Sequence, residues 1–188
     1  MQRNTFLYRL LITAVLLAVG MVLPFLTGQM QTLGQLISPL HIPVFICGLT
    51  CGWSWGAALG FILPIFRGLI FGMPPFPAVG MPMAFEMLVY GLVTGLLYPM
   101  LRKVFQNQHI VAMVIAMLAA MILGRCAGGA AKAVMMGIQG NAYSFSAFIA
   151  SYFTGTAAGA VIHLFVCPYI VTMLEQARLS PVTRKAIA

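Results

Sequence analysis

Acidic side chains are almost absent from this sequence. Among its 188 residues only 2 are Asp or Glu, namely Glu86 and Glu175, against 10 Lys and Arg. Charged residues make up 6% of the chain and hydrophobic residues 62%, whereas about 25% of the residues in a soluble domain are charged. A chain of this composition cannot cover itself with a polar surface, so it is not a soluble protein and belongs in a lipid bilayer.

Sequence motifs of enzymes are also missing. The chain contains no HExxH, no GxSxG and no pair of neighbouring acids, and two carboxylates supply little general acid–base capacity. It has no phosphate-binding loop, so any step driven by ATP must come from a partner. We therefore predict that this protein is not an enzyme and that it holds no cofactor.

Cysteine is sparse, and its four positions all lie in apolar sequence: Cys47, Cys51, Cys126 and Cys167. We interpret them as small packing residues that form no disulfides. Cys47 and Cys51 share a helix face, but no His or acid lies near them in the sequence. A metal site is therefore not predicted.

Apolar runs account for most of the length, which suits about six spans of roughly 20 to 25 residues joined by short loops. We predict an all-α integral membrane protein, a single six-helix domain over residues 1–188. The predicted spans are 6–26, 39–55, 56–72, 83–101, 110–136 and 145–174. The first 27 residues imitate a signal peptide, but TGQMQT follows them without a small-x-small cleavage site, so we expect a permanent helix.

Most basic residues flank the apolar runs, so the net charge of +8 does not imply nucleic-acid binding. Six spans put both termini on one side, and cytoplasmic loops are enriched in Lys and Arg. Seven basic residues then lie on the cytoplasmic side: Arg3, Arg9, Arg102, Lys103, Arg178, Arg184 and Lys185. We predict a multi-pass protein of the cell membrane with both termini in the cytoplasm.

The remaining basic residues and one acid lie inside predicted spans, toward their outer halves. An ionisable side chain at membrane depth is costly and marks a functional site by default. We expect them, with polar residues of the outer loops, to bind a small molecule from outside. The predicted site residues are Arg67, Glu86, Arg125, Lys132, Gln35, Asn141 and Tyr143. Their excess positive charge favours a ligand with a carboxylate or phosphate.

An alternative interpretation is structural. Arg67 and Glu86 then form a buried ion pair across the helix hairpin, and Lys132 reaches toward the outer headgroups. Arg125 still lacks an acid, because Glu175 belongs to the inner side. Between the hairpin helices, the segment GMPPFPAVGMP cannot form regular structure and is typical of a shaped lid or wall.

Two further local features bear on packing. Ala14 and Ala18 lie four residues apart, a spacing at which small side chains let another helix approach closely. This pair indicates either packing within the protein or the docking of a partner's helix. The Ser38-Pro39 dipeptide predicts a helix start, with Ser38 as the cap and Pro39 in the first turn. His41 is expected to be solvated or to cap this helix.

In combination, these features resemble a known family. The six spans, the Ala14 and Ala18 pair, the polar loop after the first span and the Pro-rich loop after the third resemble the substrate-binding S component of an energy-coupling factor (ECF) transporter. The segments GQLISPLHIPVFICGLTCGW and MPMAFEMLVYGLVTGLLY are similar to those of vitamin-binding S components. The resemblance covers nearly the whole chain.

The resemblance implies a function and partners. An S component binds a vitamin or related micronutrient near its outer face and delivers it through a transmembrane T component that two ATPases energise. Ala14 and Ala18 would be the face that docks on the T component. The positive site favours pantothenate as the first choice, while folate, cobalamin, pyridoxine-type vitamins and riboflavin stay open.

Two other classes of protein also stay open. One is a stand-alone channel or small carrier, which internal repeats would favour; the two halves of the chain show no convincing similarity. The other is a structural membrane subunit without a ligand. An Arg125 without an acid argues against that second class, because a buried guanidinium needs water, carbonyl groups or a ligand.

Overall fold

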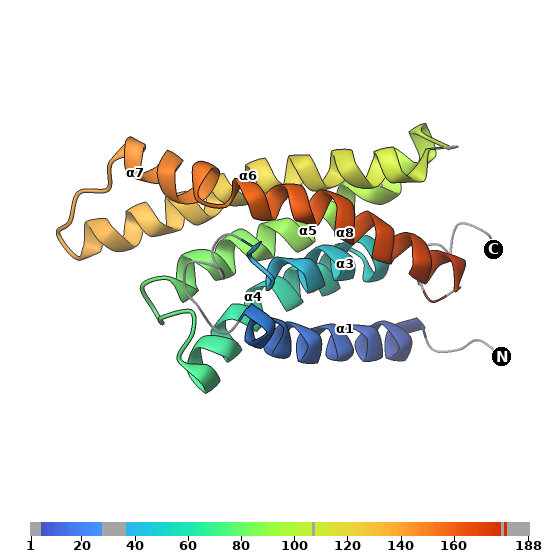
Figure 1. Cartoon of the computed structure of the whole chain (residues 1–188), viewed down its shortest axis with the longest axis horizontal. Coiled ribbons are helices and arrows are strands. Elements are labelled where there is room, and N and C mark those ends of the chain that lie inside the picture. Colours follow the sequence, from blue (N-terminus) through green and yellow to red (C-terminus); the bar gives the residue numbers. More distant parts are fainter. Residues whose placement is uncertain (1–4, 28–36, 107, 178, 180–188) are drawn as a thin grey trace.

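The protein is described by a computed structural model over residues 5–27, 37–106, 108–177 and 179. All regular structure in these ranges is helical, and the helices run up and down in one bundle (Figure 1). In chain order they are α1 (Thr5–Val22), η1 (Leu23–Thr27), α3 (His41–Cys51), α4 (Trp53–Phe71), α5 (Gly80–Val104), α6 (His109–Ile138), α7 (Phe145–Ile149), η2 (Ala150–Thr154) and α8 (Ala157–Gln176).

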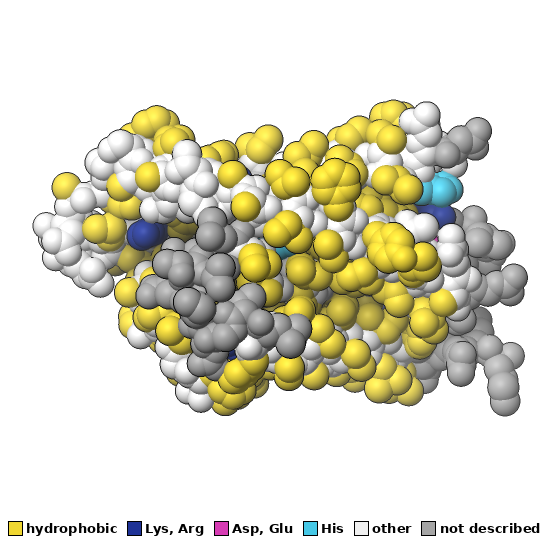
Figure 2. Space-filling model, viewed as in Figure 1, with side chains coloured by type: hydrophobic (Ala, Val, Ile, Leu, Met, Phe, Trp, Pro, Cys, Tyr) yellow, Lys and Arg dark blue, Asp and Glu magenta, His cyan; other side chains and the backbone are white. Residues whose placement is uncertain are grey.

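The predicted all-helical membrane protein is confirmed. Within the described ranges, 5 helical stretches are long and apolar enough to cross a bilayer, and α3 is a shorter apolar helix. Hydrophobic side chains cover much of the face of the bundle that Figure 2 shows, along its length. On α1, for example, Leu7, Val15 and Val22 are all exposed. Such a surface is stable in contact with lipid and not with water.

The bundle has two different ends. The start of α1 and the end of α8 lie at one end, which we call the terminal end, together with the connections from α3 to α4 and from α5 to α6 (Figure 1). The opposite end, which we call the loop end, contains η1, the Pro-rich segment 72–79 between α4 and α5, and the segment 139–144 between α6 and α7.

The boundary between α3 and α4 differs from the prediction. The spans predicted at 39–55 and 56–72 meet at Gly52 instead, where φ is +97°. Only glycine adopts such a conformation readily, so Gly52 ends α3 and α4 starts at once. The predicted Ser38 cap is also wrong, because α3 begins at His41. Ser38 has a φ of +47°, and its carbonyl accepts a hydrogen bond from the His41 amide at 3.1 Å.

The core lies between α3, α4, α5 and α6, and its fully buried side chains include Phe45, Leu49, Leu63, Met87 and Met113. Glycines let α4 and α5 touch backbone to backbone. A Cβ on Gly56 would lie 2.7 Å from the Gly91 carbonyl oxygen. Such contacts fix the two helices against each other, so α5 presents Glu86 and Tyr90 toward α6 in a defined position.

The segment predicted as one span at 145–174 is interrupted. It consists of α7, the wider helical turn η2 and, after Gly155 and Thr156, the helix α8. The Gly155 amide donates to the Ala150 carbonyl at 2.9 Å, five residues back, and the Thr156 hydroxyl donates to the Tyr152 carbonyl at 2.7 Å. Wide turns of this kind are frequent at functional sites. This one forms a wall of the cavity described next.

Candidate functional site

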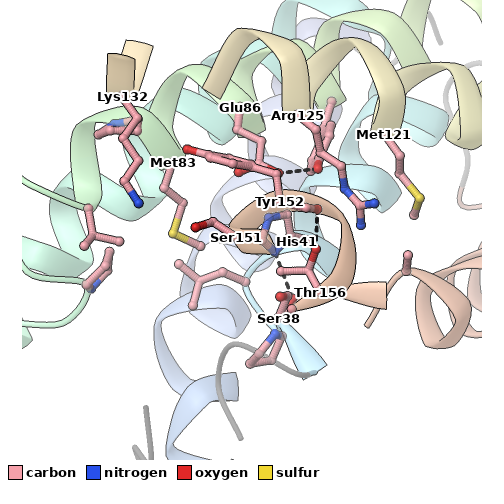
Figure 3. A pocket seen from close by; sticks show the side chains of 18 of the residues that line it. Ser38, His41, Met83, Glu86, Met121, Arg125, Lys132, Ser151, Tyr152 and Thr156 are labelled. Carbon is pink, nitrogen blue, oxygen red and sulfur yellow. Dashed lines mark hydrogen bonds between the residues drawn. The ribbon is translucent and has the colours of Figure 1, made fainter. Parts of the chain in front are cut away.

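A cavity of about 480 Å³ opens in the half of the bundle nearer the loop end. Its walls come from α3, α5, α6, the Pro-rich segment and the stretch from η2 to α8 (Figure 3). Pockets of this size enclose most of the surface of a small organic ligand, and polar groups among apolar walls then fix its orientation. The polar groups here come from segments that are more than 100 residues apart, such as His41 and His163.

Arg67 lies in α4 at the edge of this cavity and is 2% exposed. It forms no ion pair with Glu86. One of its terminal nitrogens donates to the Met21 carbonyl, and its guanidinium carbon lies 5.1 Å and 5.3 Å from the ring centroids of Phe25 and Phe71. The alternative of an ion pair across the hairpin is therefore not what the structure shows. Arg67 instead holds the end of α1, where η1 begins.

Glu86 and Arg125 face the cavity from neighbouring helices, α5 and α6 (Figure 3). Glu86 accepts a hydrogen bond from the Tyr90 hydroxyl. The Arg125 Nε is buried and has no hydrogen-bond partner among the described residues, and its guanidinium carbon lies 5.4 Å from the Phe153 ring centroid. A buried donor without a partner is costly, and an anionic ligand would supply that partner.

Close packing of α6 on α5 brings these two residues together. A Cβ on Gly128 would lie 2.9 Å from the Glu86 Cβ and 3.0 Å from Cε1 of Tyr152. Glycine at this position therefore lets α6 approach α5 and η2 closely. The close approach expected from the small residues around Arg125 is present, and it sets the depth at which Arg125 enters the cavity.

Lys132 lies two turns beyond Arg125, about 10 Å further along α6 toward the loop end. Its ammonium group points into the cavity (Figure 3) and lies 5.5 Å from the centroid of the Tyr143 ring. The two cations share one face of α6, as their spacing predicts. Together they give the cavity a positive wall that extends from its middle to the loop end.

The cavity is therefore lined by Arg67, Glu86, Arg125 and Lys132 from the predicted set. Asn141 does not line it and is exposed between α6 and α7. Tyr143 is half-buried in a separate shallow groove beside Phe148. Asn141 lies past the cavity because α6 extends beyond it before the chain turns, whereas Tyr143 stays at its edge, with its ring 5.5 Å from the Lys132 ammonium group. Gln35 lies outside the described residues.

Sequence reasoning missed the polar residues at the inner end of the cavity. His41 and His163 line it and are 7% and 3% exposed, so the expected solvated or capping His41 is buried. His41 Nδ1 lies 3.0 Å and His163 Nε2 3.2 Å from the Ser38 carbonyl oxygen. A histidine inside an apolar run such as VIHLFV is the one signal in the sequence that could have identified His163.

Tyr152 and Thr156 also line the cavity and were not predicted. Tyr152 lies in the widened turn η2 and Thr156 lies two residues after it, and this local distortion has no simple sequence signature. At the opposite side of the molecule, Ala14 and Ala18 lie on the exposed face of α1. Neither packs inside the described bundle, so the interpretation that they serve internal packing is not supported.

A comparison with protein families agrees with this arrangement. A family model described as ECF transporter, substrate-specific component, matches residues 8–174. The chain belongs to this family. A search of curated proteins and a search of solved structures each gave no significant match. S components are membrane-embedded transporter subunits that bind small-molecule substrates and work with a T component and ATPases. This S component is therefore a multi-pass cell-membrane protein and a transporter subunit.

Proposed function

We propose that this S component captures an organic anion, a vitamin or related micronutrient, from outside the cell. The observation that carries the proposal is Arg125, a cation on the cavity wall whose buried Nε has no partner among the described residues. Lys132 and Arg67 add positive charge, and Glu86 is the one acid that lines the cavity. A carboxylate on the ligand would pair with Arg125 in the two-pronged geometry that guanidinium favours.

Pantothenate is our first choice among the candidate vitamins. It is a small carboxylate, and a cavity of about 480 Å³ favours small ligands over cobalamin. Folate also carries carboxylates and is the second choice. Riboflavin and pyridoxine-type vitamins rank lower because they have no anionic group for Arg125.

The charge distribution supports an orientation with both termini in the cytoplasm and six spans, of which α3 is the shortest. Among the described residues, Arg102 and Lys103 end α5 at the terminal end, and Arg9 lies in the first turns of α1 there. Cytoplasmic ends of membrane helices carry such basic residues. The loop end, where the cavity opens, then faces the outside. Tyr143, and with it Asn141 and Gln35, would act near this entrance.

Delivery inward requires the partners of the family. We propose that Ala14 and Ala18 dock on the T component, which two ATPases energise. Both alanines are exposed on α1, as are the neighbouring Val15 and Leu11. Small side chains on an exposed helix face allow a partner helix to approach closely.

Native mass spectrometry of the detergent-purified protein, followed by a thermal-shift screen of vitamins, tests the substrate. A bound or stabilising organic anion supports the proposal. If only uncharged vitamins bind, the assignment of an anionic substrate is wrong, although the family stays the same. If no vitamin binds at all, this chain does not capture such a substrate by itself.

The docking surface is tested by Ala14→Trp and Ala18→Trp. We expect both variants to bind the vitamin normally and to lose uptake and assembly with the T component. Ala158→Trp is the matched control, because Ala158 is exposed on α8 instead of α1. Normal uptake by both α1 variants would remove this face from the docking surface.

A further inference from the structure

We infer that Arg67 is a positioning residue for docking on the T component, because it fixes the loop end of α1, the helix that carries Ala14 and Ala18. This inference rests on the proposed docking of α1 and adds to it a residue that lies outside the docking face. It follows from the way α1 is attached to the bundle and from the position of Pro24 at the end of that helix.

The helix α1 is attached to the bundle at few points. Gly20 is the one buried residue within α1, which the structure describes in full, and the helix lies along the edge of the bundle (Figure 1). Near the terminal end, the rings of Phe6 and Trp55 have their centroids 5.4 Å apart. The Tyr8 hydroxyl there donates to the Leu179 carbonyl at 2.9 Å. The direction of such a helix is fixed only if its other end is attached too.

At the loop end, α1 comes close to α4. A Cβ on Gly20 would lie 2.6 Å from Cδ2 of Leu63, so the absence of a side chain at Gly20 lets the two helices touch. Arg67 lies one turn beyond Leu63 in α4, and Met21 directly follows Gly20 in α1. Close packing at Gly20 therefore brings the Met21 backbone within reach of the Arg67 side chain.

Pro24 leaves the Met21 carbonyl without a backbone donor. After α1 the chain tightens into η1, a 3-10 helix, in which each carbonyl pairs with the N–H three residues later. For Met21 that later residue is Pro24, which has no N–H. An unpaired carbonyl is costly inside a bilayer, because water cannot replace the missing donor there.

Arg67 supplies this donor from α4. One of its terminal nitrogens donates to the Met21 carbonyl. Its guanidinium carbon lies 5.1 Å from the centroid of the Phe25 ring and 5.3 Å from that of Phe71, and the two rings pack edge to face with their centroids 5.0 Å apart. One side chain thus contacts the backbone of α1, a ring of η1 and a ring of α4, and it fixes the place where α1 ends.

This attachment point lies close to the proposed docking face. Met21 comes three residues after Ala18, so the two are about one helical turn apart. Small side chains favour docking only where a partner helix can approach closely and in one orientation. If α1 were loose at its loop end, the T component would have to order it on docking, and this cost would weaken assembly.

The first test measures the position of α1 in the protein alone, without ligand or partner. Electron paramagnetic resonance records the distance between spin labels at Val22→Cys in α1 and Ile122→Cys in α6, both exposed positions, and Cys126→Ser removes the exposed native thiol. We expect Arg67→Met to broaden this distance distribution. A label at Leu7→Cys, near the terminal end of α1, should keep the distribution of the wild type.

Pro24→Ala is the suppressor that this role predicts, because it returns a backbone N–H to the end of α1. Added to Arg67→Met, it should restore the narrow distribution at Val22. Arg102→Met is the matched control: it removes an arginine that ties α5 to α8 and should leave the distribution at Val22 unchanged. An unchanged distribution in Arg67→Met, or no restoration by Pro24→Ala, overturns the role assigned to Arg67. Arg67→Gln, whose shorter side chain also loses the Met21 carbonyl, is judged in the same way if Arg67→Met does not fold.

The second test measures docking. Each variant competes with the wild type for a limiting amount of T component and ATPases, with no vitamin added. Arg67→Met should enter the complex at least about tenfold less than the wild type, which is the loss expected for one hydrogen bond to a charged group. Pro24→Ala should recover most of this loss.

The outcomes separate this inference from the proposed docking face. Normal competition by Arg67→Met, while Ala14→Trp and Ala18→Trp fail to assemble, overturns the inference and leaves the docking face standing. Normal assembly of both tryptophan variants overturns the docking face, and with it the link from Arg67 to docking. A tenfold loss in Arg67→Met that Pro24→Ala reverses supports the inference.

Discussion

Each end of the bundle contains a glutamate, a tyrosine and an arginine, but these residues interact differently at the two ends. At the terminal end, Glu175 accepts hydrogen bonds from the Tyr98 hydroxyl at 2.8 Å and from Arg102 at 3.0 Å, which ties α8 to α5. At the loop end, Glu86 accepts from Tyr90, and Arg125 forms no ion pair within the described ranges. The comparison teaches that an ion pair between two helices holds them together, whereas a cation that forms no ion pair with the protein can bind an anionic ligand.

Packing also differs between the two ends: it is close at the terminal end and leaves a cavity near the loop end. Near the terminal end, Tyr98 and Val171 are fully buried between α5 and α8. Nearer the loop end, the chain before α8 widens into η2, and Ser151 and Thr156 line a cavity there. We expect substitutions at the loop end to change ligand affinity and those at the terminal end to change stability.

The largest effect is expected for Gly128→Leu, which would force α6 away from Glu86 and Tyr152. Overpacking of this kind shifts the backbone and forces side chains off their rotamers. Arg125 and Glu86 would then be displaced, so affinity for the captured vitamin should fall by up to about a hundredfold in titration calorimetry, or about 2.8 kcal/mol. Gly137→Leu in the same helix is the control, because a Cβ there meets nothing within 4 Å. Equal affinities of the two variants would show that close α5–α6 packing does not form the site.

Removal of the central cation comes next. Arg125→Ala should weaken an anionic vitamin by more than about tenfold, or about 1.4 kcal/mol, and should leave the melting temperature nearly unchanged. Arg102→Ala is its counterpart at the terminal end, where we expect unchanged affinity and a lower melting temperature. Titration calorimetry and thermal unfolding in detergent measure both. A reversed pattern would contradict the contrast between the ends.

A smaller effect is expected for Glu175→Gln, which replaces charge-assisted hydrogen bonds by neutral ones. The variant should lose about 1 kcal/mol of stability, or roughly 2 to 4 °C in melting temperature, with unchanged affinity. Glu86→Gln provides the comparison, since it should alter affinity more than stability. Weaker vitamin binding by Glu175→Gln would show that the two ends are coupled.

The smallest effect is expected for Lys132→Gln. Lys132 is half-buried toward the loop end, where solvent and salt screen its charge, so affinity should fall by only about two- to fivefold. The salt dependence of binding should also become weaker than in the wild type, while Lys132→Arg should preserve it. Calorimetry at low and high salt measures both. No change at either salt concentration would restrict the anionic subsite to Arg125.

Much of the architecture could be predicted because it depends on local composition. Long apolar runs predict helices that cross a bilayer, and the seven-residue spacing of Arg125 and Lys132 places both on one helix face. Boundaries were less predictable where one backbone conformation decides them, as at Gly52 and Ser38. The widening at η2 also escaped prediction, since its Ser and Thr residues fit an ordinary helix equally well.

The sequence by itself determined that this chain is a helical membrane protein with basic residues inside its spans and small residues where helices meet. Only the tertiary structure decided what those residues face. It placed Arg67 on the Met21 carbonyl instead of on Glu86, placed Tyr143 in a shallow groove beside Lys132 at the edge of the cavity, and joined Ser38 to His163 across 125 positions of the chain. The physical reason is that the rotation and depth of each helix depend on packing against distant segments, which local periodicity does not encode.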